Sequence, residues 1–166
     1  MTPTDGSAYA RPCDSDPVLP PPLFGRVVRE EKSDQYAVFL VEDDIDDRIQ
    51  LLEALKDSPH VHDVRCFNDS DSLIDHFFTE DYYFSSFVSN VPVLVLLDIH
   101  LPGMNGLDAL RKMKSHPLTG EVRVIVMTGD HSPESILQAA KLGADGYLIK
   151  PGRIDQIHDI LQGTGL

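Results

Sequence analysis

Carboxylates, a hydroxyl and an ammonium group follow four apolar runs of the chain directly. The residues concerned are Glu42, Asp43, Asp98, Thr128 and Lys150. Unit charges about 4 Å apart near a protein surface repel by about 4 kcal/mol at an effective dielectric of 20, so carboxylates gathered at one place need a cation or a proton. Oxygen ligands, without a Cys or His pair at ligand spacing, favour a hard ion and describe Mg²⁺. A carboxylate among such groups can also act as a nucleophile that accepts a phosphoryl group.

Each of these residues also has an ordinary interpretation when it is taken alone. An isolated acidic turn such as Glu42-Asp43-Asp44 is typical of a solvated helix start. Thr128 would then be a plain residue at a strand end, and Lys150 a surface lysine. Asp98 itself is compatible with two roles, a metal ligand or a nucleophile. The chemical interpretation therefore depends on whether the fold brings these side chains together.

The apolar runs predict strands that alternate with helices along the chain. Runs without polar alternation are typical of strands buried on both faces, and we expect strands at 36–41, 61–67, 93–97, 122–127 and 146–149. Apolar periodicity predicts helices that begin near residues 45, 70, 107, 133 and 154. Five alternations indicate an α/β fold with a single parallel sheet covered on both faces. Ligands of such sheets bind at the carboxyl ends of the strands, which is where every polar residue named above falls.

Local signals place the helix ends and the turn after Asp98. The first helix should face the core with one stripe, formed by Ile45, Ile49, Leu52 and Leu55. Asn68, Asp69 or Ser70 is expected to cap the second helix, and Ser132 the fourth, with Pro133 at its first position and Gly143 at its end. The turn-forming residues Pro102, Gly103, Asn105 and Gly106 require a sharp fold of the backbone over Asp98. Residues 79–90 are predicted either to extend the second helix or to cover a sheet edge.

Composition sets the domain organisation and excludes some partners. Six of the twelve prolines lie in the first 22 residues, so we expect a disordered tail at 1–35, one domain at 36–163 and a short end at 164–166. A net charge of −13 is unfavourable for direct nucleic-acid binding. No apolar run is long enough for a membrane span. Two cysteines in unrelated contexts favour a reduced, cytoplasmic protein.

Four segments resemble the signatures of two-component response regulator receiver domains. They are FLVEDD at 39–44, LLDIHLPGMNG at 96–106, VIVMTG at 124–129 and GYLIKP at 146–151. The resemblance covers residues 36–162, in the order and at the spacing of the family. It implies a flavodoxin-like, doubly wound (βα)5 sandwich with a five-stranded parallel sheet in the order 2-1-3-4-5.

The resemblance also assigns roles to individual residues. It implies that Asp98 accepts a phosphoryl group from a histidine kinase or a histidine phosphotransfer protein, in a reaction that depends on Mg²⁺. Glu42, Asp43, Asp98 and the backbone carbonyl of His100 would hold the ion, whereas the His100 side chain is expected to be incidental. Thr128 and Tyr147 resemble the switch pair of the family, and Lys150 resembles its phosphate-binding lysine.

Several points separate this chain from other receivers and leave alternatives open. Glu42 stands where many receivers have Asp, and parts of the sequence also look like the stand-alone receivers of bacterial phytochrome kinases. Only four residues follow the last predicted helix, so output would pass to a downstream protein partner, with the chain a monomer or a phosphorylation-dependent homodimer. The chain is then not an enzyme beyond its own phosphotransfer and dephosphorylation. The alternatives are a scaffold receiver that takes no phosphate, and a Mg²⁺-dependent aspartyl phosphatase. Such phosphatases use an Asp-x-Asp motif, and in this chain His100 stands in place of the second acid.

Overall fold

The structure, a computed structural model, describes residues 34–79, 91–129, 132–150 and 154–162, all within the unit Glu31–Leu166. Residues 1–33 of the predicted tail, most of the 79–90 segment and the predicted end at 164–166 lie outside the described residues. The last two residues of the predicted tail contact the domain. Gln35 Nε2 donates to the carbonyl of Pro59 at 3.0 Å, and the carbonyl of Asp34 lies 3.1 Å from His60 Nδ1.

Five parallel strands form one sheet with the order β2-β1-β3-β4-β5, which confirms the predicted topology. The strands are β1 (Tyr36–Val41), β2 (Val61–Phe67), β3 (Val93–Asp98), β4 (Arg123–Thr128) and β5 (Gly146–Ile149). The first, second and fifth have the predicted bounds. The third extends one residue further and the fourth begins and ends one residue later than predicted, because Asp98 pairs with Met127 and Thr128 pairs with Ile149. These two polar residues therefore end their strands rather than follow them.

The five helices of the described residues begin at, or one residue from, the positions expected from the sequence, and two of them have a predicted cap. They are α1 (Ile45–Lys56), α2 (Ser70–Phe77), α4 (Gly106–Ser115), α5 (Pro133–Lys141) and α6 (Ile154–Leu161). Asp69 caps α2 by accepting the backbone N–H of Ser72 at 2.7 Å, and Ser132 caps α5 with Pro133 at its start. Gly143 ends α5 with a φ of 93°, a conformation that favours glycine. No helix of the described ranges is both long and apolar enough to cross a membrane.

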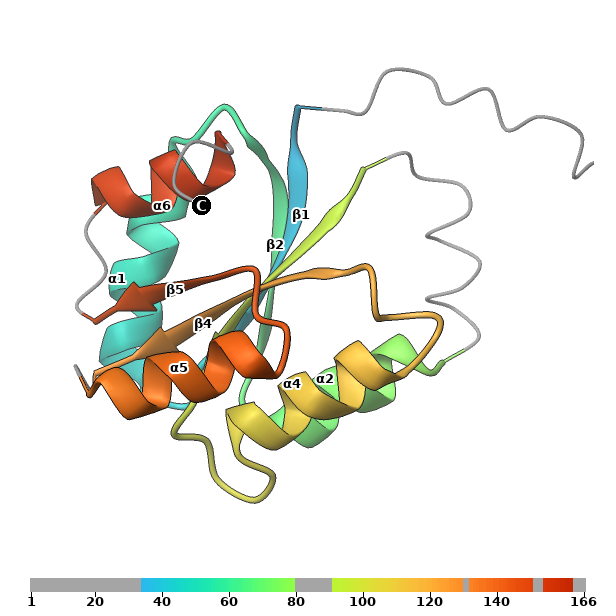
Figure 1. Cartoon of the computed structure of the whole chain (residues 1–166). Coiled ribbons are helices and arrows are strands. Elements are labelled where there is room, and N and C mark those ends of the chain that lie inside the picture. The colour runs from blue at the N-terminus through green and yellow to red at the C-terminus, as the bar shows by residue number, and fades with distance from the viewer. Residues whose placement is uncertain (1–33, 80–90, 130–131, 151–153, 163–166) are drawn as a thin grey trace, which may run out of the picture. The chain divides into compact units, whose positions relative to one another are not determined.

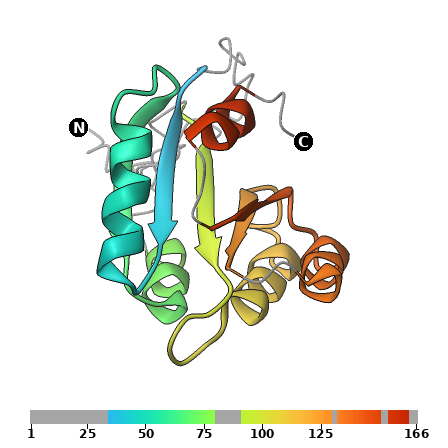
Figure 2. The same ribbon diagram turned by 90° about the vertical axis from the view of Figure 1, so that its left-hand side faces the viewer.

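The helices cover the sheet in two layers, and each layer has its own apolar core (Figures 1 and 2). One core lies between the sheet and α2, α4 and α5, and includes Phe39, Phe77 and Met113. The other lies between the sheet and α1 and α6, and includes Leu55 and Ile157. Because apolar side chains fill both faces of the central strands, polar side chains are accommodated only at the strand ends.

The predicted core face of α1 was wrong in its first two turns. Ile45 and Ile49 are 59% and 51% exposed, whereas Leu51, Ala54 and Leu55 are buried. At about 100° per residue, Ile49 lies about 200° around the helix from Leu51, so the two side chains cannot face the same core. The buried stripe therefore runs through Leu51 and Leu55, and the two isoleucines leave an apolar strip on the surface.

Candidate functional site

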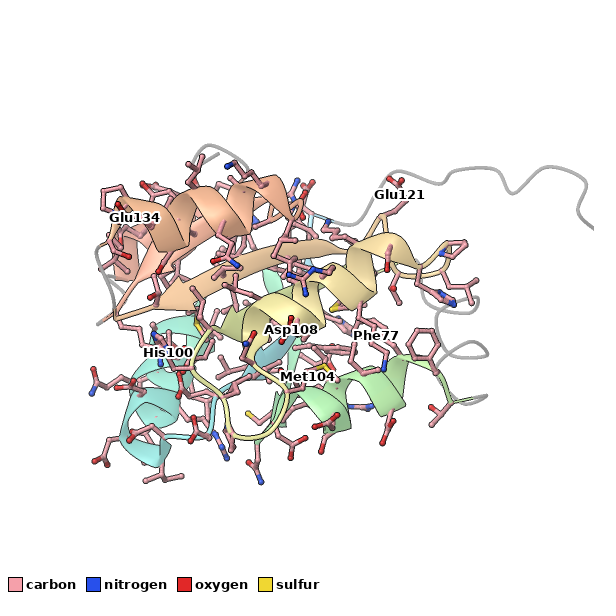
Figure 3. All side chains as sticks on the ribbon, turned by 60° about the horizontal axis from the view of Figure 1, so that its bottom comes forward. Phe77, His100, Met104, Asp108, Glu121 and Glu134 are labelled. Carbon is pink, nitrogen blue, oxygen red and sulfur yellow. The ribbon has the colours of Figure 1, made fainter. Side chains whose placement is uncertain are left out.

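The carboxyl ends of the parallel strands bring together the polar residues that the sequence singled out. Glu42 follows β1, Asp98 and Thr128 end β3 and β4, and Lys150 follows β5. Glu42, Asp98 and Thr128 are buried, although each is polar. Figure 2 shows that the arrowheads of β1 and β3, which mark the carboxyl ends of these strands, point the same way. In Figure 3, His100 after β3 and Glu134 of α5 lie toward one end of the domain, and Glu121 lies toward the other.

Lys150 is the cation at the centre of this group. Its Nζ lies 2.5 Å from Glu42 Oε2, 2.8 Å from Asp98 Oδ2 and 3.1 Å from Asp47 Oδ2. Burial of the ammonium by itself would lower the pKa of Lys150, but hydrogen bonds to Asp98 and Glu42 outweigh burial and raise this pKa above its ordinary value. Lys150 therefore stays charged and neutralises part of the buried acid.

Glu42 is a fully buried carboxylate of the site. Burial raises the pKa of Glu42, the ammonium of Lys150 lowers it, and the neighbouring Asp98 charge raises it further, with a net rise above the ordinary value. Glu42 Oε1 accepts the backbone N–H of Asp44 at 3.1 Å. Glu42 Oε2 is buried and, apart from its ion pair with Lys150, receives no hydrogen bond among the described residues. An oxygen in this state is suited to a further cation.

Three carboxylates are close enough to share such a cation. One oxygen from each of Glu42, Asp43 and Asp98 lies within 4.8 Å of the other two. Asp43 is exposed, which leaves the group open to solvent on its side, while Glu42 and Asp98 form the buried wall. A set of oxygen donors with one open side fits a hard divalent ion that keeps some of its water, such as Mg²⁺.

The loop after β3 fixes the orientation of Asp98. The backbone N–H of His100 donates to Asp98 Oδ1 at 3.0 Å, and the N–H of Gly106 donates to the carbonyl of Ile99 at 2.9 Å. A Cβ atom on Gly106 would lie 2.0 Å from the Asp98 carbonyl oxygen, so only glycine allows this closure. The predicted sharp fold over Asp98 is confirmed, and Figure 3 shows His100 and Met104 on the loop.

Of the predicted switch pair, the structure brings only Thr128 to the site. Thr128 is buried, and its carbonyl accepts the backbone N–H of Lys150 at 2.8 Å. Tyr147 is 50% exposed and pairs with Val126, two residues before Thr128 on β4. Because side chains alternate along a strand and paired residues share a face, Tyr147 and Thr128 lie on the same face of the sheet.

The first turn of α1 contributes two residues that the sequence did not single out as part of the site. Asp47 contacts Lys150, and the guanidinium of Arg48 donates to the carbonyl of Glu42 from Nε at 3.1 Å and from Nη2. Asp44 caps this helix, with Oδ1 accepting the N–H groups of Asp46 and Asp47, and backbone hydrogen bonds lower the pKa of Asp44. No signal in the sequence marks Asp47, because acidic residues are ordinary in a first helical turn and only the packing of α1 shows its contact with Lys150.

The chain is similar to proteins whose names state a signalling role. Residues 38–162 match the sequence profile of the response regulator receiver domain. Response regulator Rcp1 of Synechocystis is 26% identical over 134 residues, which are 81% of this chain and 89% of Rcp1. The crystal structure of its Mn²⁺-bound form has a TM-score of 0.60 and covers 77% of this chain and 90% of that one.

A second solved structure and a longer relative agree with this result. The phosphorylated cyanobacterial phytochrome response regulator RcpA has a TM-score of 0.62 at 27% identity and covers 78% of this chain and 90% of that one. The nitrate/nitrite response regulator NarL of Escherichia coli is 46% identical over 59 residues, which are 36% of this chain and only 26% of NarL. With three quarters of its length matched by the profile, the chain belongs to the response regulator receiver domain family.

Proposed function

We propose that Asp98 accepts a phosphoryl group from the phosphohistidine of a histidine kinase or a histidine phosphotransfer protein. The observation that carries this proposal is the environment of Asp98. It is a buried carboxylate, held by the His100 N–H and the Lys150 ammonium and flanked by two further carboxylates. A carboxylate fixed in this way at the open end of a parallel sheet is prepared to act as a nucleophile.

The proposed transfer requires stabilisation of negative charge. An Asp98 oxygen forms a bond to phosphorus while the bond from phosphorus to the histidine nitrogen breaks, and that nitrogen keeps the electron pair. Lys150 contacts the phosphoryl oxygens, and the Thr128 hydroxyl donates to them. A Mg²⁺ ion held by Glu42, Asp43, Asp98 and the His100 carbonyl would supply a further positive charge for these oxygens. The Mn²⁺-bound form of Rcp1 and the phosphorylated form of RcpA support this assignment by similarity.

The proposed output is a change of protein surface. A phosphoryl group on Asp98 would attract the Thr128 hydroxyl, and Tyr147, which is half exposed on the same face of the sheet, could move into the space that is released. This movement would alter the surface of α5, β5 and α6, to which a downstream protein or a second copy of the chain binds. Phosphorylation shifts the equilibrium between the original and the altered surface only by the difference in its interactions with these two states.

The surface of α1 supports a protein as the phosphoryl donor. Ile45 and Ile49 are more than half exposed on the helix that begins directly after Glu42, Asp43 and Asp44. Apolar side chains beside an acidic pocket fit a partner that docks a helix against α1 while it presents its phosphohistidine to Asp98. A small-molecule donor would need no such surface.

A labelling experiment tests the proposal. The full chain is incubated with acetyl phosphate and Mg²⁺, and phosphate is counted by intact mass. We expect one phosphate on the wild type, none on Asp98→Asn, and one on the matched control Asp108→Asn, whose carboxylate is exposed on α4 and pairs with Arg111. Labelling that survives in Asp98→Asn would exclude Asp98 as the acceptor. If neither acetyl phosphate nor a histidine kinase labels the wild type, the scaffold alternative is favoured.

A further inference from the structure

The ammonium of Lys150 is shared by three carboxylates, of which one has no part in the proposed metal site. Glu42 and Asp98 reach Lys150 from strand ends, while Asp47 reaches it from the first turn of α1, at 3.1 Å between Nζ and Oδ2. The lysine side chain is 14% exposed and that of Asp47 is 37% exposed, so the third contact lies at the rim. Asp47 is therefore the most exposed of the three carboxylates that contact Lys150.

We propose that Asp47 is a positioning residue that restrains Lys150 and weakens the binding of a phosphoryl group at Asp98. This inference rests on the proposed function and extends it to a residue outside the signatures of the chain. It assigns to Asp47 a control over how strongly the phosphorylated state is held, without direct participation in phosphoryl transfer.

The contact of Asp47 with Lys150 is independent of the proposed cation. The cluster that can hold an ion consists of Glu42, Asp43 and Asp98, and Asp47 is not part of it. A cation at that cluster draws on the oxygens of Glu42 and Asp98, which are the other two partners of Lys150. Asp47 is then the one carboxylate of the three that contacts Lys150 without also binding the cation. The restraint thus acts in the metal-loaded state, in which phosphoryl transfer takes place.

The charge of Asp47 also acts directly on an anion at Asp98. Because Asp47 Oδ2 and Asp98 Oδ2 both contact Lys150 Nζ, the two oxygens lie within about 6 Å of each other. A phosphoryl group on aspartate adds negative charge at this place, as it does on other side chains. Asp47 both repels that charge and occupies one of the three N–H donors of the ammonium. Both effects disfavour the occupied state.

The start of α1 does not depend on the Asp47 side chain. Asp44 is the N-cap, and its Oδ1 accepts the backbone N–H groups of Asp46 and Asp47 at 2.9 and 3.0 Å. The Asp47 side chain is free to hold Lys150, and Asp47→Asn keeps the size and the carbonyl acceptor of the side chain while it removes the charge. Asp46→Asn is the matched control, since Asp46 is exposed in the same helical turn and has no ion pair with Lys150.

Beryllofluoride, a tetrahedral mimic of the phosphoryl group, measures the effect at equilibrium. With saturating Mg²⁺ and the full chain, we expect Asp47→Asn to lower the Kd for beryllofluoride about three- to tenfold, and Asp46→Asn to leave it within twofold. The advantage of Asp47→Asn should shrink as ionic strength rises, because salt screens a charge at the rim. A purely structural role of Asp47 would predict weaker binding in the variant and no such salt dependence.

Two results would overturn the inference. One is a Kd for Asp47→Asn within twofold of the wild type, and the other is an equal gain in Asp46→Asn, which would show that total charge is responsible. Beryllofluoride binding by Asp98→Asn tests the proposed function and not the role of Asp47. If the wild type binds no beryllofluoride, acetylation of Lys150 by an N-hydroxysuccinimide ester, followed by peptide mass analysis, tests the restraint. We expect Lys150 to react at least threefold faster in Asp47→Asn, and an equal rate would refute the restraint.

Discussion

Replacement of Gly106 by alanine should destabilise the domain because the loop over Asp98 has no room for a side chain. The added Cβ would lie 2.0 Å from the carbonyl oxygen of Asp98 and 2.9 Å from the Cα of Ile99. Both neighbours are backbone atoms, one in the last residue of β3 and one in the buried residue that follows it, so relief requires a movement of the loop. That movement also weakens the hydrogen bond from the Gly106 N–H to the Ile99 carbonyl.

The size of the loss follows from these two effects. Overpacking typically costs about 1–3 kcal/mol, and a lost backbone hydrogen bond costs about 1 kcal/mol. Alanine recovers at most about 1 kcal/mol as a better helix residue at the start of α4. We therefore expect a net loss of about 1–3 kcal/mol, a substantial part of the roughly 5–15 kcal/mol by which domains are stable. The melting temperature should fall by about 10 °C.

Urea unfolding followed by circular dichroism measures this loss, with Gly129→Ala as the matched control. A Cβ on Gly129 would meet no atom of the described residues within 4 Å, so that variant should stay within about 0.5 kcal/mol of the wild type. The reasoning would be refuted if Gly106→Ala were as stable as Gly129→Ala. A lower stability with an unchanged dependence on urea would show that the variant loses stability without a change in the surface exposed on unfolding.

Two further predictions concern the charges of the site. Burial raises the pKa of Glu42 above its ordinary value of 4.5, so the stability linked to its proton is present below that value and is lost as pH rises through the folded pKa. Glu42→Gln, which resembles the protonated side chain, should therefore gain stability relative to the wild type as pH rises from about 5 to 8 in metal-free buffer. If urea unfolding gives a difference in unfolding free energy between variant and wild type that does not vary with pH, this prediction is contradicted. Mg²⁺ at 100 times its Kd should stabilise the folded chain by about 2.7 kcal/mol, and Asp43→Ala should reduce the rise in melting temperature. Equal responses of Asp43→Ala and the wild type in thermal unfolding would argue against the metal assignment.

The strands and the assembly of the site could be predicted because strands buried on both faces have a recognisable sequence pattern, an apolar run without polar alternation. The bounds 36–41, 61–67 and 146–149 are those of β1, β2 and β5, since apolar runs without alternation have few other structures available. Parallel strands then place their ends at one edge, and this brings Asp98 to Lys150 across 52 positions of the chain. Local chemistry and topology are sufficient for this part of the site.

The parts that the sequence did not predict depend on the rotation and contacts of α1. Ile45 and Ile49 have helical spacing, but spacing alone does not say which of two neighbouring stripes packs on the sheet. Asp47 is an ordinary acidic residue for a first helical turn, and only the packed position of α1 shows that it reaches Lys150. Asp69 was one of three possible caps, because each of them has a side-chain oxygen in the right region of the chain.

The two oxygens of Asp98 have different partners, the His100 N–H on Oδ1 and the Lys150 ammonium on Oδ2. A carboxylate in water rotates freely, and its oxygens are equivalent. In this protein the symmetry is broken by the fold, so a donor would meet two chemically distinct oxygens in a fixed orientation. In the proposed phosphoryl transfer, the rotational entropy of the Asp98 carboxylate would then be lost during folding rather than in the transfer step, which would lower the entropic part of the barrier.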